Sequence, residues 1–265
     1  MQAASVLETV RDITVASHLI GEMTSSTLED PLFDRYKNLC CSIMPVEQQS
    51  KDYKMILDYL NKTYEPVKLG DLSYGVSVQN VFTVESGASP SYAEMKKLPN
   101  KYLLWCGTRS SNLLRHLHKG FQPAVCSIPV AGYMFGRGIV CSDAVVKAAR
   151  YGFTAVNRPE GFLVLAMVSL GDRVTKMSST PEDTKKLESK KAGVKGLGRK
   201  KTHESEHFVW KNDVKVPCRQ IMASEHKESP LEYNEQTEKK FVQVSIRFLV
   251  GVKFEEQDVF MDTAE

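Results

Sequence analysis

The chain has 265 residues, of which 42% are hydrophobic and 25% charged, a balance that is ordinary for a globular protein and excludes wholesale disorder. Its 35 basic and 32 acidic residues leave a net charge of +3, which is too even to indicate nucleic-acid binding by itself. The longest apolar run, residues 162–168, is far shorter than the ~20 residues that span a bilayer, and the first residues do not resemble a signal peptide.

The six cysteines are scattered through the chain without a CxxC pair or a regular spacing. We therefore predict free thiols, with neither a disulfide framework nor a structural zinc site, in a soluble protein of a reducing compartment. His116 and His118 fall on opposite faces of a predicted helix, where they could not share one metal ion. We expect no bound metal and no contact with a membrane.

The first predicted element is an amphipathic helix. Apolar residues recur at steps of three and four from Val6 to Ile20, and the helix is expected to end near Gly21. The polar composition of residues 24–31 predicts a linker. Because a lone helix cannot bury its own apolar stripe, we expect this one to belong to a domain upstream, with its stripe only partly covered here.

From residue 39 onward, strands dominate. A strand is predicted at 39–46, followed by a helix whose buried face is made by Tyr53, Ile56, Leu57, Leu60 and Tyr64. Further strands are predicted at 76–84, 102–106, 162–170, 208–216 and 240–254. Short helices are predicted at 111–118, capped by Ser110 or Ser111, and at 143–151, capped by Asp143. This order indicates an α+β fold built on antiparallel sheet.

Residues 172–206 lack periodicity and are rich in Lys, Ser, Thr and Gly, which predicts a long solvated surface loop. The alternative is a contact with an acidic partner or a nucleic-acid backbone. The basic residues that would make this contact are Lys190, Lys191, Lys195, Arg199, Lys200 and Lys201.

Four short segments carry a resemblance to a known family. They are LLWCGTR at 103–109, GYMFGRGI at 132–139, VKGLG at 194–198 and LEYNE at 231–235. In order and spacing they resemble LLWHGSR, GYMFGKGIY, VKGLG and LYNEY of the NAD-binding core of the poly(ADP-ribose) polymerase family. The resemblance predicts a catalytic domain at 29–256 and a tail at 257–265. Residues 1–28 then resemble the last helix of a regulatory helical domain, with its linker.

The resemblance implies an ADP-ribosyltransferase fold of two packed, mostly antiparallel sheets with short peripheral helices, preceded by one helix of a truncated regulatory helical domain. It also implies NAD as the substrate. Glu235 matches the carboxylate that stabilises the positive charge developing as the bond to nicotinamide breaks. Gly107 matches the glycine that holds the carboxamide, and Tyr151 a tyrosine that stacks on the nicotinamide ring. Thr108 and Tyr133 are placed in the same pocket.

Several matched positions depart from the family pattern. Cys106 replaces a ribose-anchoring histidine, Val140 a ring-packing tyrosine and Ala148 a carboxamide-binding serine, while Arg115 and Gln122 replace a glycine and an arginine near the adenosine. The His-Tyr-Glu set thus becomes Cys-Val-Glu, which resembles the divergent plant members of the family. Cys106 and Ala148 weaken or remove two hydrogen bonds to NAD, and Val140 removes one aromatic face. Together these changes are expected to cost about 2–4 kcal/mol of binding free energy, or roughly a 30- to 1000-fold loss of NAD affinity.

Each site residue also has a plainer interpretation. Outside its motif, Glu235 would be a solvated carboxylate, and Tyr151 would be a core side chain. Cys106 could be a nucleophile with His116 or His118 as its base. A cysteine flanked by Trp105 and Gly107 at a strand end is more often buried and inert, and we favour that interpretation.

Three functions are compatible with these residues. The first is a transferase that attaches single ADP-ribose units to proteins through Glu235. The second, which the substitutions favour, is an inactive interaction or allosteric module in a DNA-damage-response protein, and the third is a sensor of NAD or ADP-ribose without turnover. By family, we expect a monomer that is nuclear, with a cytoplasmic location as the alternative. It would meet acceptor or partner proteins, and DNA only through upstream domains.

Overall fold

The computed structural model describes residues 10, 14, 17, 31–87, 90–121, 134–135, 138–152, 159–179, 193–203, 207–238 and 243–257. The helices are α2 (Pro31–Asn38), α3 (Lys51–Thr63), α4 (Tyr92–Lys96), α5 (Ser110–Lys119), α6 (Val145–Gly152) and the 3-10 helix η2 (Lys211–Asp213). The strands are β1 (Cys41–Pro45), β2 (Val67–Leu69), β3 (Leu72–Ser86), β4 (Lys101–Cys106), β5 (Ile139–Ser142), β6 (Glu160–Ser169), β7 (Val174–Met177), β8 (Gly193–Gly196), β9 (Lys200–Thr202), β10 (Phe208–Trp210), β11 (Val214–Val216), β12 (Ile221–Ala223), β13 (Glu235–Glu238) and β14 (Val244–Gln257).

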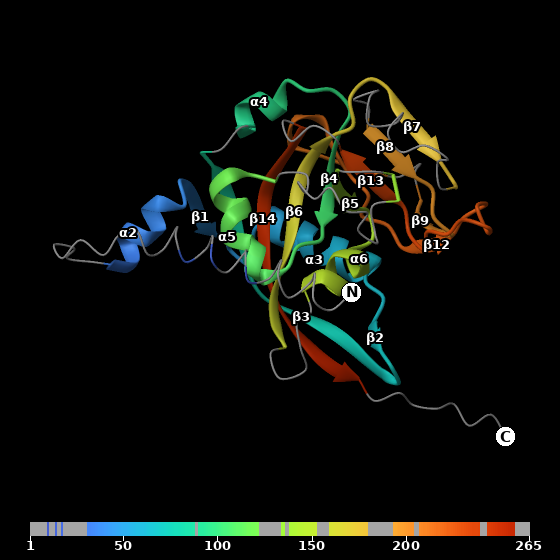
Figure 1. Ribbon diagram of the computed structural model, residues 1–265, viewed down its shortest axis with the longest axis horizontal. Coiled ribbons are helices and arrows are strands. Elements are labelled where there is room, and N and C mark those ends of the chain that lie inside the picture. The colour runs from blue at the N-terminus through green and yellow to red at the C-terminus, as the bar shows by residue number, and fades with distance from the viewer. Residues whose placement is uncertain are drawn as a thin grey trace.

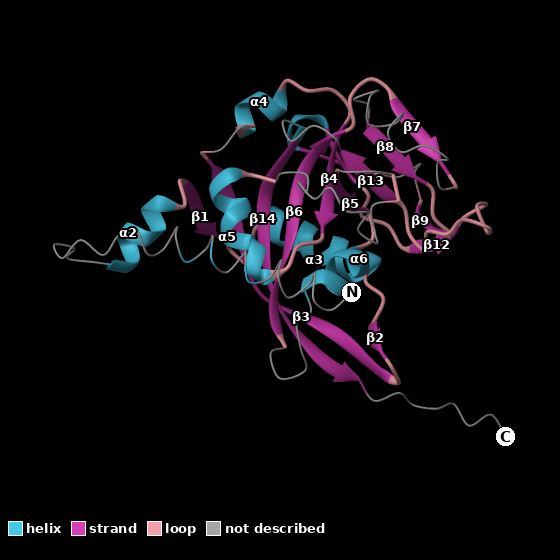
Figure 2. Ribbon diagram, viewed as in Figure 1, coloured by secondary structure: helices cyan, strands magenta, loops and turns pink. Residues whose placement is uncertain are grey.

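Twelve of these strands join in one large, mostly antiparallel sheet, and β9 and β12 form a small second sheet (Figures 1 and 2). The main path runs β1-β3-β14-β6-β4-β5-β13-β8-β7. Only the pairs β7–β8 and β4–β11 are parallel among the described strands. The predicted α+β class with mostly antiparallel sheet and short helices is confirmed.

Apolar side chains cover both faces of the large sheet, because successive residues of a strand point to opposite faces. On β4, Leu103 and Trp105 belong to one buried cluster, and Leu104 and Cys106 to the other. Helices α3 and α6 pack on the first face, and α5 packs on the second, so that α5 lies in front of the sheet and α3 behind it in Figure 1. The sheet is therefore the middle layer of the described fold.

Helix α3 illustrates how the sequence specifies this packing. Ser50 caps its first turn by accepting a hydrogen bond from the Tyr53 backbone N–H, and Lys62 lies in the last turn, where a cation suits the helix dipole. The buried Tyr59 ring packs 5.1 Å from Trp105, measured between ring centroids. Its hydroxyl donates to the carbonyl of Leu103, which fixes the helix against β4.

Most of the predicted strands and helices are present, and three regions differ from the prediction. Residues 208–216 form a hairpin rather than one strand, because Asn212 and Asp213 adopt φ angles of 58° and 59° and turn the chain between β10 and β11. Helix α2 over residues 31–38 was not predicted, and residue 31 was assigned to the linker, although proline is favoured at the first position of a helix. Helix α4 was not predicted at all.

The caps of α5 and α6 also differ from expectation. Arg109 precedes α5 without a side-chain capping bond. The Asp143 carboxylate accepts from Thr202 instead of capping α6, and Ser142 Oγ accepts from the Ala144 backbone N–H at 3.1 Å. Asp143 is therefore a tertiary contact rather than a helix cap.

The prediction of a long solvated loop at 172–206 was wrong for its described part. Strands β7, β8 and β9 lie in this segment, and β8 is hydrogen-bonded to both β7 and β13. Three or four residues per strand are too few to show a period, which explains why the sequence gave no sign of them.

The opening helix falls mostly outside the described residues. Val10, Thr14 and Ser17 are helical and exposed, and Thr14 Oγ1 donates to the Val10 carbonyl at 2.8 Å. The domain limits at 28/29 and 256/257 stay predictions.

None of the described helices combines the length and the apolar composition that a membrane-crossing helix requires.

Candidate active site

Glu235 opens strand β13 in the interior of the large sheet. Its neighbours on either side are β5 and β8, and only 5% of the residue is exposed. A buried carboxylate is costly unless a cation or hydrogen bonds compensate its charge. Lys147 of α6 supplies that cation in a direct ion pair with Glu235. The pair joins the sheet to the helix at the position that the resemblance marks as catalytic.

Lys147 itself lies in a surrounding that disfavours its charge. Burial, with the Arg150 charge adding to it, lowers the pKa of Lys147 to about 8, while the carboxylates of Asp143 and Glu232 oppose the shift. The Glu235 carboxylate in the ion pair also favours the ammonium form. The ion pair therefore places an ammonium group beside the buried Glu235 carboxylate.

Hydrogen bonds around Asn234 hold the backbone next to Glu235. The carbonyl of Asn234 accepts from Ser142 Oγ at 2.7 Å, and its side-chain oxygen accepts from the Gly198 N–H at 3.0 Å. Its side-chain nitrogen donates to Asp143, which also accepts from the hydroxyl of Thr202 at 2.7 Å. Two segments distant in sequence, at residues 142–143 and at Gly198, are thus fixed to the residue before Glu235.

A second set of contacts surrounds Tyr233. Its hydroxyl donates to Glu65, and Lys200 donates to both oxygens of the same carboxylate at 2.6 and 2.9 Å. Glu232 pairs with Arg150 of α6 at 2.9 Å. Each residue of the segment 232–235 therefore makes a side-chain hydrogen bond or ion pair, and the ion pairs of Glu232 and Glu235 connect the segment to α6.

The candidate nicotinamide contacts lie at the junction of β4 and α6. A Cβ atom added at Gly107 would collide with the ring of Tyr151, so only glycine fits beneath this ring. Tyr151 keeps 46% of its surface exposed, whereas Ala148, one turn earlier on α6, is buried. Thr108 is buried and donates to the Arg109 carbonyl. The structure thus brings Gly107, Tyr151 and Ala148 together.

Cys106 is not a free thiol, which corrects the expectation from the cysteine spacing. It ends β4 directly opposite Cys141 of β5, with the Cα atoms 4.2 Å apart, and the two form a disulfide. Val140 precedes Cys141 and is half-buried, opposite Thr237 of β13. The side chains of Cys106 and Val140, at the positions matched to the family's histidine and tyrosine, therefore present neither a hydrogen-bond donor nor an aromatic ring.

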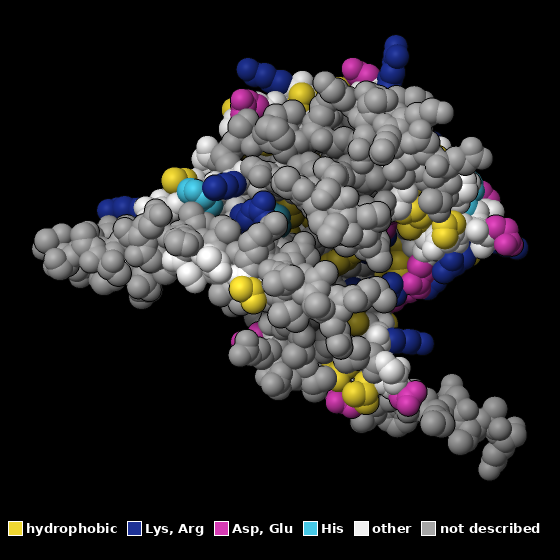
Figure 3. Space-filling model, viewed as in Figure 1, with side chains coloured by type: hydrophobic (Ala, Val, Ile, Leu, Met, Phe, Trp, Pro, Cys, Tyr) yellow, Lys and Arg dark blue, Asp and Glu magenta, His cyan; other side chains and the backbone are white. Residues whose placement is uncertain are grey.

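The adenosine-side residues are only partly described. Arg115 lies on α5 beside His116, and Figure 3 shows Lys, Arg and His side chains gathered where α5 lies. Burial, followed by the Arg115 charge, lowers the pKa of His116 to about 4, while a hydrogen bond with the Gly120 backbone opposes the shift. Gln122 and Tyr133 lie outside the described residues.

Sequence reasoning missed two residues of this site. Lys147 lies four positions before Tyr151, so the two share one face of α6, and a lysine inside the apolar run AVVKAA was the available signal. Cys141 gave no signal, because its pairing with Cys106 depends on the register of β4 and β5. Within the described ranges, no group of three or more His, Cys, Asp or Glu side chains is arranged to hold a metal ion.

Comparison with known proteins agrees with this geometry. The poly(ADP-ribose) polymerase catalytic domain family matches residues 50–254. The chain is 69% identical over 263 residues to the Protein ADP-ribosyltransferase PARP3 of Medicago truncatula, covering 99% of the chain and 33% of that protein, and 68% identical over 255 residues to its Arabidopsis thaliana counterpart, covering 96% and 31%. Poly [ADP-ribose] polymerase 1 of Arabidopsis thaliana is 38% identical over 256 residues, covering 94% and 25%. The chain spans about a third of the length of its PARP3 relatives.

Removal of the Asn234 side chain tests the hydrogen bonds that hold β13. Asn234→Ala leaves the buried Gly198 N–H without its acceptor, which costs about 1–3 kcal/mol of unfolding free energy. Urea denaturation measures this loss. The control Gln79→Ala removes an exposed amide and should change stability by less than about 0.5 kcal/mol. Equal stability of the two variants would contradict the structural role of Asn234.

His116 predicts a pH dependence of stability. Its pKa is about 4 in the fold and about 6.5 in an unfolded chain, so the unfolded state binds the proton more readily between these values. The contribution of neutral His116 to the unfolding free energy should therefore be fully present above pH 6.5. The unfolding free energy should then fall by roughly 2–3 kcal/mol as the pH drops to 4. His116→Gln should flatten this part of the profile, and Ser110→Ala, on the same helix, should not. An unchanged profile in His116→Gln would refute the assignment.

Proposed function

Because the chain belongs to the poly(ADP-ribose) polymerase catalytic-domain family, we propose that it is a protein ADP-ribosyltransferase domain that binds NAD weakly and transfers single ADP-ribose units rather than polymers. The observation that carries the proposal is the buried Glu235–Lys147 pair beside the Tyr151 ring. Family domains take NAD as substrate, and this part of the matched site is built with side chains able to act on it.

The transfer itself needs a carboxylate more than it needs a proton donor. The bond between nicotinamide and the ribose C1 breaks with its electron pair leaving on nicotinamide, and an acceptor nucleophile then forms the new bond to C1. Positive charge develops on the ribose only near the transition state, so a fixed carboxylate lowers the barrier. Glu235 has that role in the proposal, and Lys147 keeps the carboxylate placed.

The substitutions explain why affinity should be low. A cystine sulfur at position 106 donates no hydrogen bond, Ala148 donates none, and Val140 offers no ring. These losses amount to about 2–4 kcal/mol of ligand binding. A poorly held ribose also loses rate, because small displacements from the reactive geometry are costly.

The second candidate is a module that does not turn NAD over, which either binds partner proteins or senses NAD or ADP-ribose. The disulfide favours this candidate. It joins Cys106, at the histidine position on β4, to Cys141 on β5, and Cys141 follows Val140 at the tyrosine position. A place in DNA-damage responses, a nuclear location and a monomeric state belong to the proposal too. DNA contact through upstream domains is a further part of the proposal, and the family resemblance is the support for all four.

Calorimetry with NAD and automodification with labelled NAD separate these functions. The transferase predicts weak binding and single-unit labelling that Glu235→Gln abolishes while NAD binding stays nearly unchanged, because the carboxylate acts mainly on the transition state. Binding without any labelling would favour the sensor, and neither signal would favour the interaction module. Robust polymer formation, or a low-micromolar dissociation constant, would contradict the weakened site.

Restoring the missing side chains should increase both signals. Cys106→His with Val140→Tyr recovers one hydrogen bond and one stacking face, so NAD affinity should rise by about 5- to 150-fold, with a further gain from Ala148→Ser. Cys141→Ser is the matched control, because it breaks the disulfide and adds at positions 106 and 140 only the weak thiol donor of Cys106, with no ring. If the control matches the rescue, the disulfide rather than the missing groups limits binding. If the triple variant gains nothing, the account of the site is wrong.

A further inference from the structure

A short ladder joins two parts of the large sheet. The first part comprises β1, β3, β14, β6 and β4, and the second comprises β5, β13, β8 and β7, which lie on either side of the β4–β5 junction in Figure 1. The β4–β5 ladder has two residue pairs, Trp105 with Ser142 and Cys106 with Cys141. By contrast, β4 pairs with β6 over six residues. The junction between the two parts is therefore narrow.

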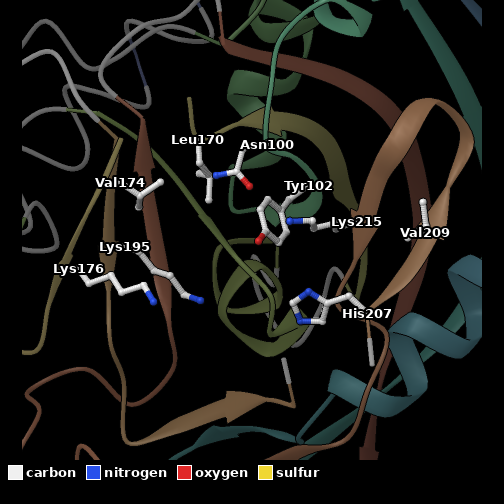
Figure 4. Close-up of a pocket in the computed structure, with 9 residues that line it drawn as sticks. All are labelled: Asn100, Tyr102, Leu170, Val174, Lys176, Lys195, His207, Val209 and Lys215. Carbon is white, nitrogen blue, oxygen red and sulfur yellow. The ribbon is translucent and has the colours of Figure 1, made fainter. Parts of the chain in front are cut away.

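The two parts separate away from this ladder. A pocket of about 410 Å³ is lined by Tyr102, near the start of β4, and by Lys176 and Lys195 of β7 and β8 (Figure 4). Strand pairing therefore does not hold the start of β4 to the second part. It holds the two parts together at the other end of β4, which is Cys106.

The Cys106–Cys141 disulfide lies at this end of the ladder. The two Cα atoms are 4.2 Å apart, which is close to the ~4.5 Å of an antiparallel pair without mutual backbone hydrogen bonds and shorter than the ~5.5 Å of a hydrogen-bonded pair. The disulfide is therefore the direct link between the two residues. Because the two kinds of pair alternate along a ladder, the backbone hydrogen bonds fall on Trp105 and Ser142.

Groups of the candidate NAD site lie on both sides of the disulfide. Gly107 directly follows Cys106 on the first part, whereas Glu235 opens β13 in the second part. Tyr151 lies on α6, which follows β5 in the chain and meets Glu235 through Lys147. The Tyr151 ring lies so close to Gly107 that an added Cβ atom would collide with it. The disulfide thus ties the glycine beneath the ring to the strands that hold Glu235.

We propose that the Cys106–Cys141 disulfide is a redox switch of the candidate NAD site, which is competent when oxidised and is loosened by a dithiol reductant. The inference rests on the proposed transferase function and adds its regulation. Disulfides in a reducing compartment, where the proposed function places the chain, are usually transient and catalytic or redox-sensing. Since α6 keeps its buried apolar contacts without the disulfide, reduction should loosen the end of β4 and leave the fold in place.

Reduction proceeds by thiol–disulfide exchange. A thiolate of the dithiol attacks one sulfur of the cystine, which forms a mixed disulfide and releases the other cysteine as a thiolate. The second thiol of the reductant then attacks the mixed disulfide, and the reductant leaves as a cyclic disulfide. Two electrons and two protons thereby pass to the cysteines, and a small-molecule disulfide such as oxidised glutathione reverses the reaction. Because both cysteines are buried, exchange requires the end of the ladder to open.

Reduction should lower transfer. The freed Cys106 thiol is only a weak hydrogen-bond donor, so the missing histidine weakens NAD binding in both redox states. Displacement of Gly107 from the Tyr151 ring is the larger effect, because small errors in the placement of reacting groups are costly. We expect single-unit transfer at low NAD concentration to fall about threefold or more, and to recover with oxidised glutathione.

Dithiothreitol treatment of the chain tests the proposal. Mass spectrometry of unreduced peptides should show residues 106 and 141 linked in the oxidised protein. Reduction should speed amide hydrogen exchange in residues 104–107 and 140–142 about threefold or more, with no change in residues 248–252 of β14. It should also lower Tm by at least about 5 °C, because the disulfide joins residues separated by 35 positions.

Two sets of variants separate the switch from other effects of the reductant. Cys141→Ser should behave as the reduced protein and should not respond to dithiothreitol, and Cys141→Ala excludes an effect of a buried hydroxyl. The matched control Cys40→Ser removes a free, exposed thiol and should respond as the unchanged chain does.

The proposal is overturned if the oxidised chain contains no link between residues 106 and 141, or if reduction leaves hydrogen exchange in these strands unchanged. It is also overturned if reduction increases transfer, or if both Cys141 variants still respond to dithiothreitol. An absence of transfer in both redox states would instead contradict the proposed function, and the difference in hydrogen exchange would still decide whether the disulfide controls the end of β4.

Discussion

A charged carboxylate in the interior of a sheet needs compensation by a cation or by hydrogen bonds, and at Glu235 a fixed lysine supplies it. Glu235 lies between two neighbouring strands and meets Lys147, which can reach it only if α6 docks against the sheet. Docking α6 also places Tyr151 over Gly107 and buries Ala148. One ion pair therefore links the position of the acidic group to the position of the ring that would face the substrate.

The surroundings of this pair are densely hydrogen-bonded, whereas the positions matched to substrate-holding groups offer few polar contacts. Asn234 is bonded to Ser142, Gly198 and Asp143, and Tyr233 to Glu65, so the backbone before Glu235 has little freedom. By contrast, the positions that the family fills with histidine and tyrosine carry a cystine and a valine. The proposed function therefore combines an intact fold around Glu235 with weakened contacts to NAD at positions 106 and 140.

Long, periodic elements could be predicted from the sequence, and short or paired ones could not. The alternation before Phe254 identified β14, and the stripe around Ile56 identified α3. The motifs placed Glu235, Gly107 and Tyr151 in one site, but the Cys106–Cys141 pair depends on strand register, which one sequence does not show. The α4 helix was predictable in principle, because its Ser-x-x-Glu capping box was visible at Ser91 and Glu94. Strands β7 and β8 were not, since four residues define no period.

The coupling between Lys147 and Glu235 is the most direct test of this account. A double-mutant cycle with Lys147→Met and Glu235→Gln, measured by urea denaturation at pH 7, isolates the pair from the separate effects of each change. Each single variant leaves a buried charge without its partner, and the double variant leaves none. The account predicts a coupling energy of at least about 1.5 kcal/mol, as for other hydrogen bonds to charged groups. A coupling energy below about 0.3 kcal/mol would show that Lys147 does not hold Glu235, and would contradict the account.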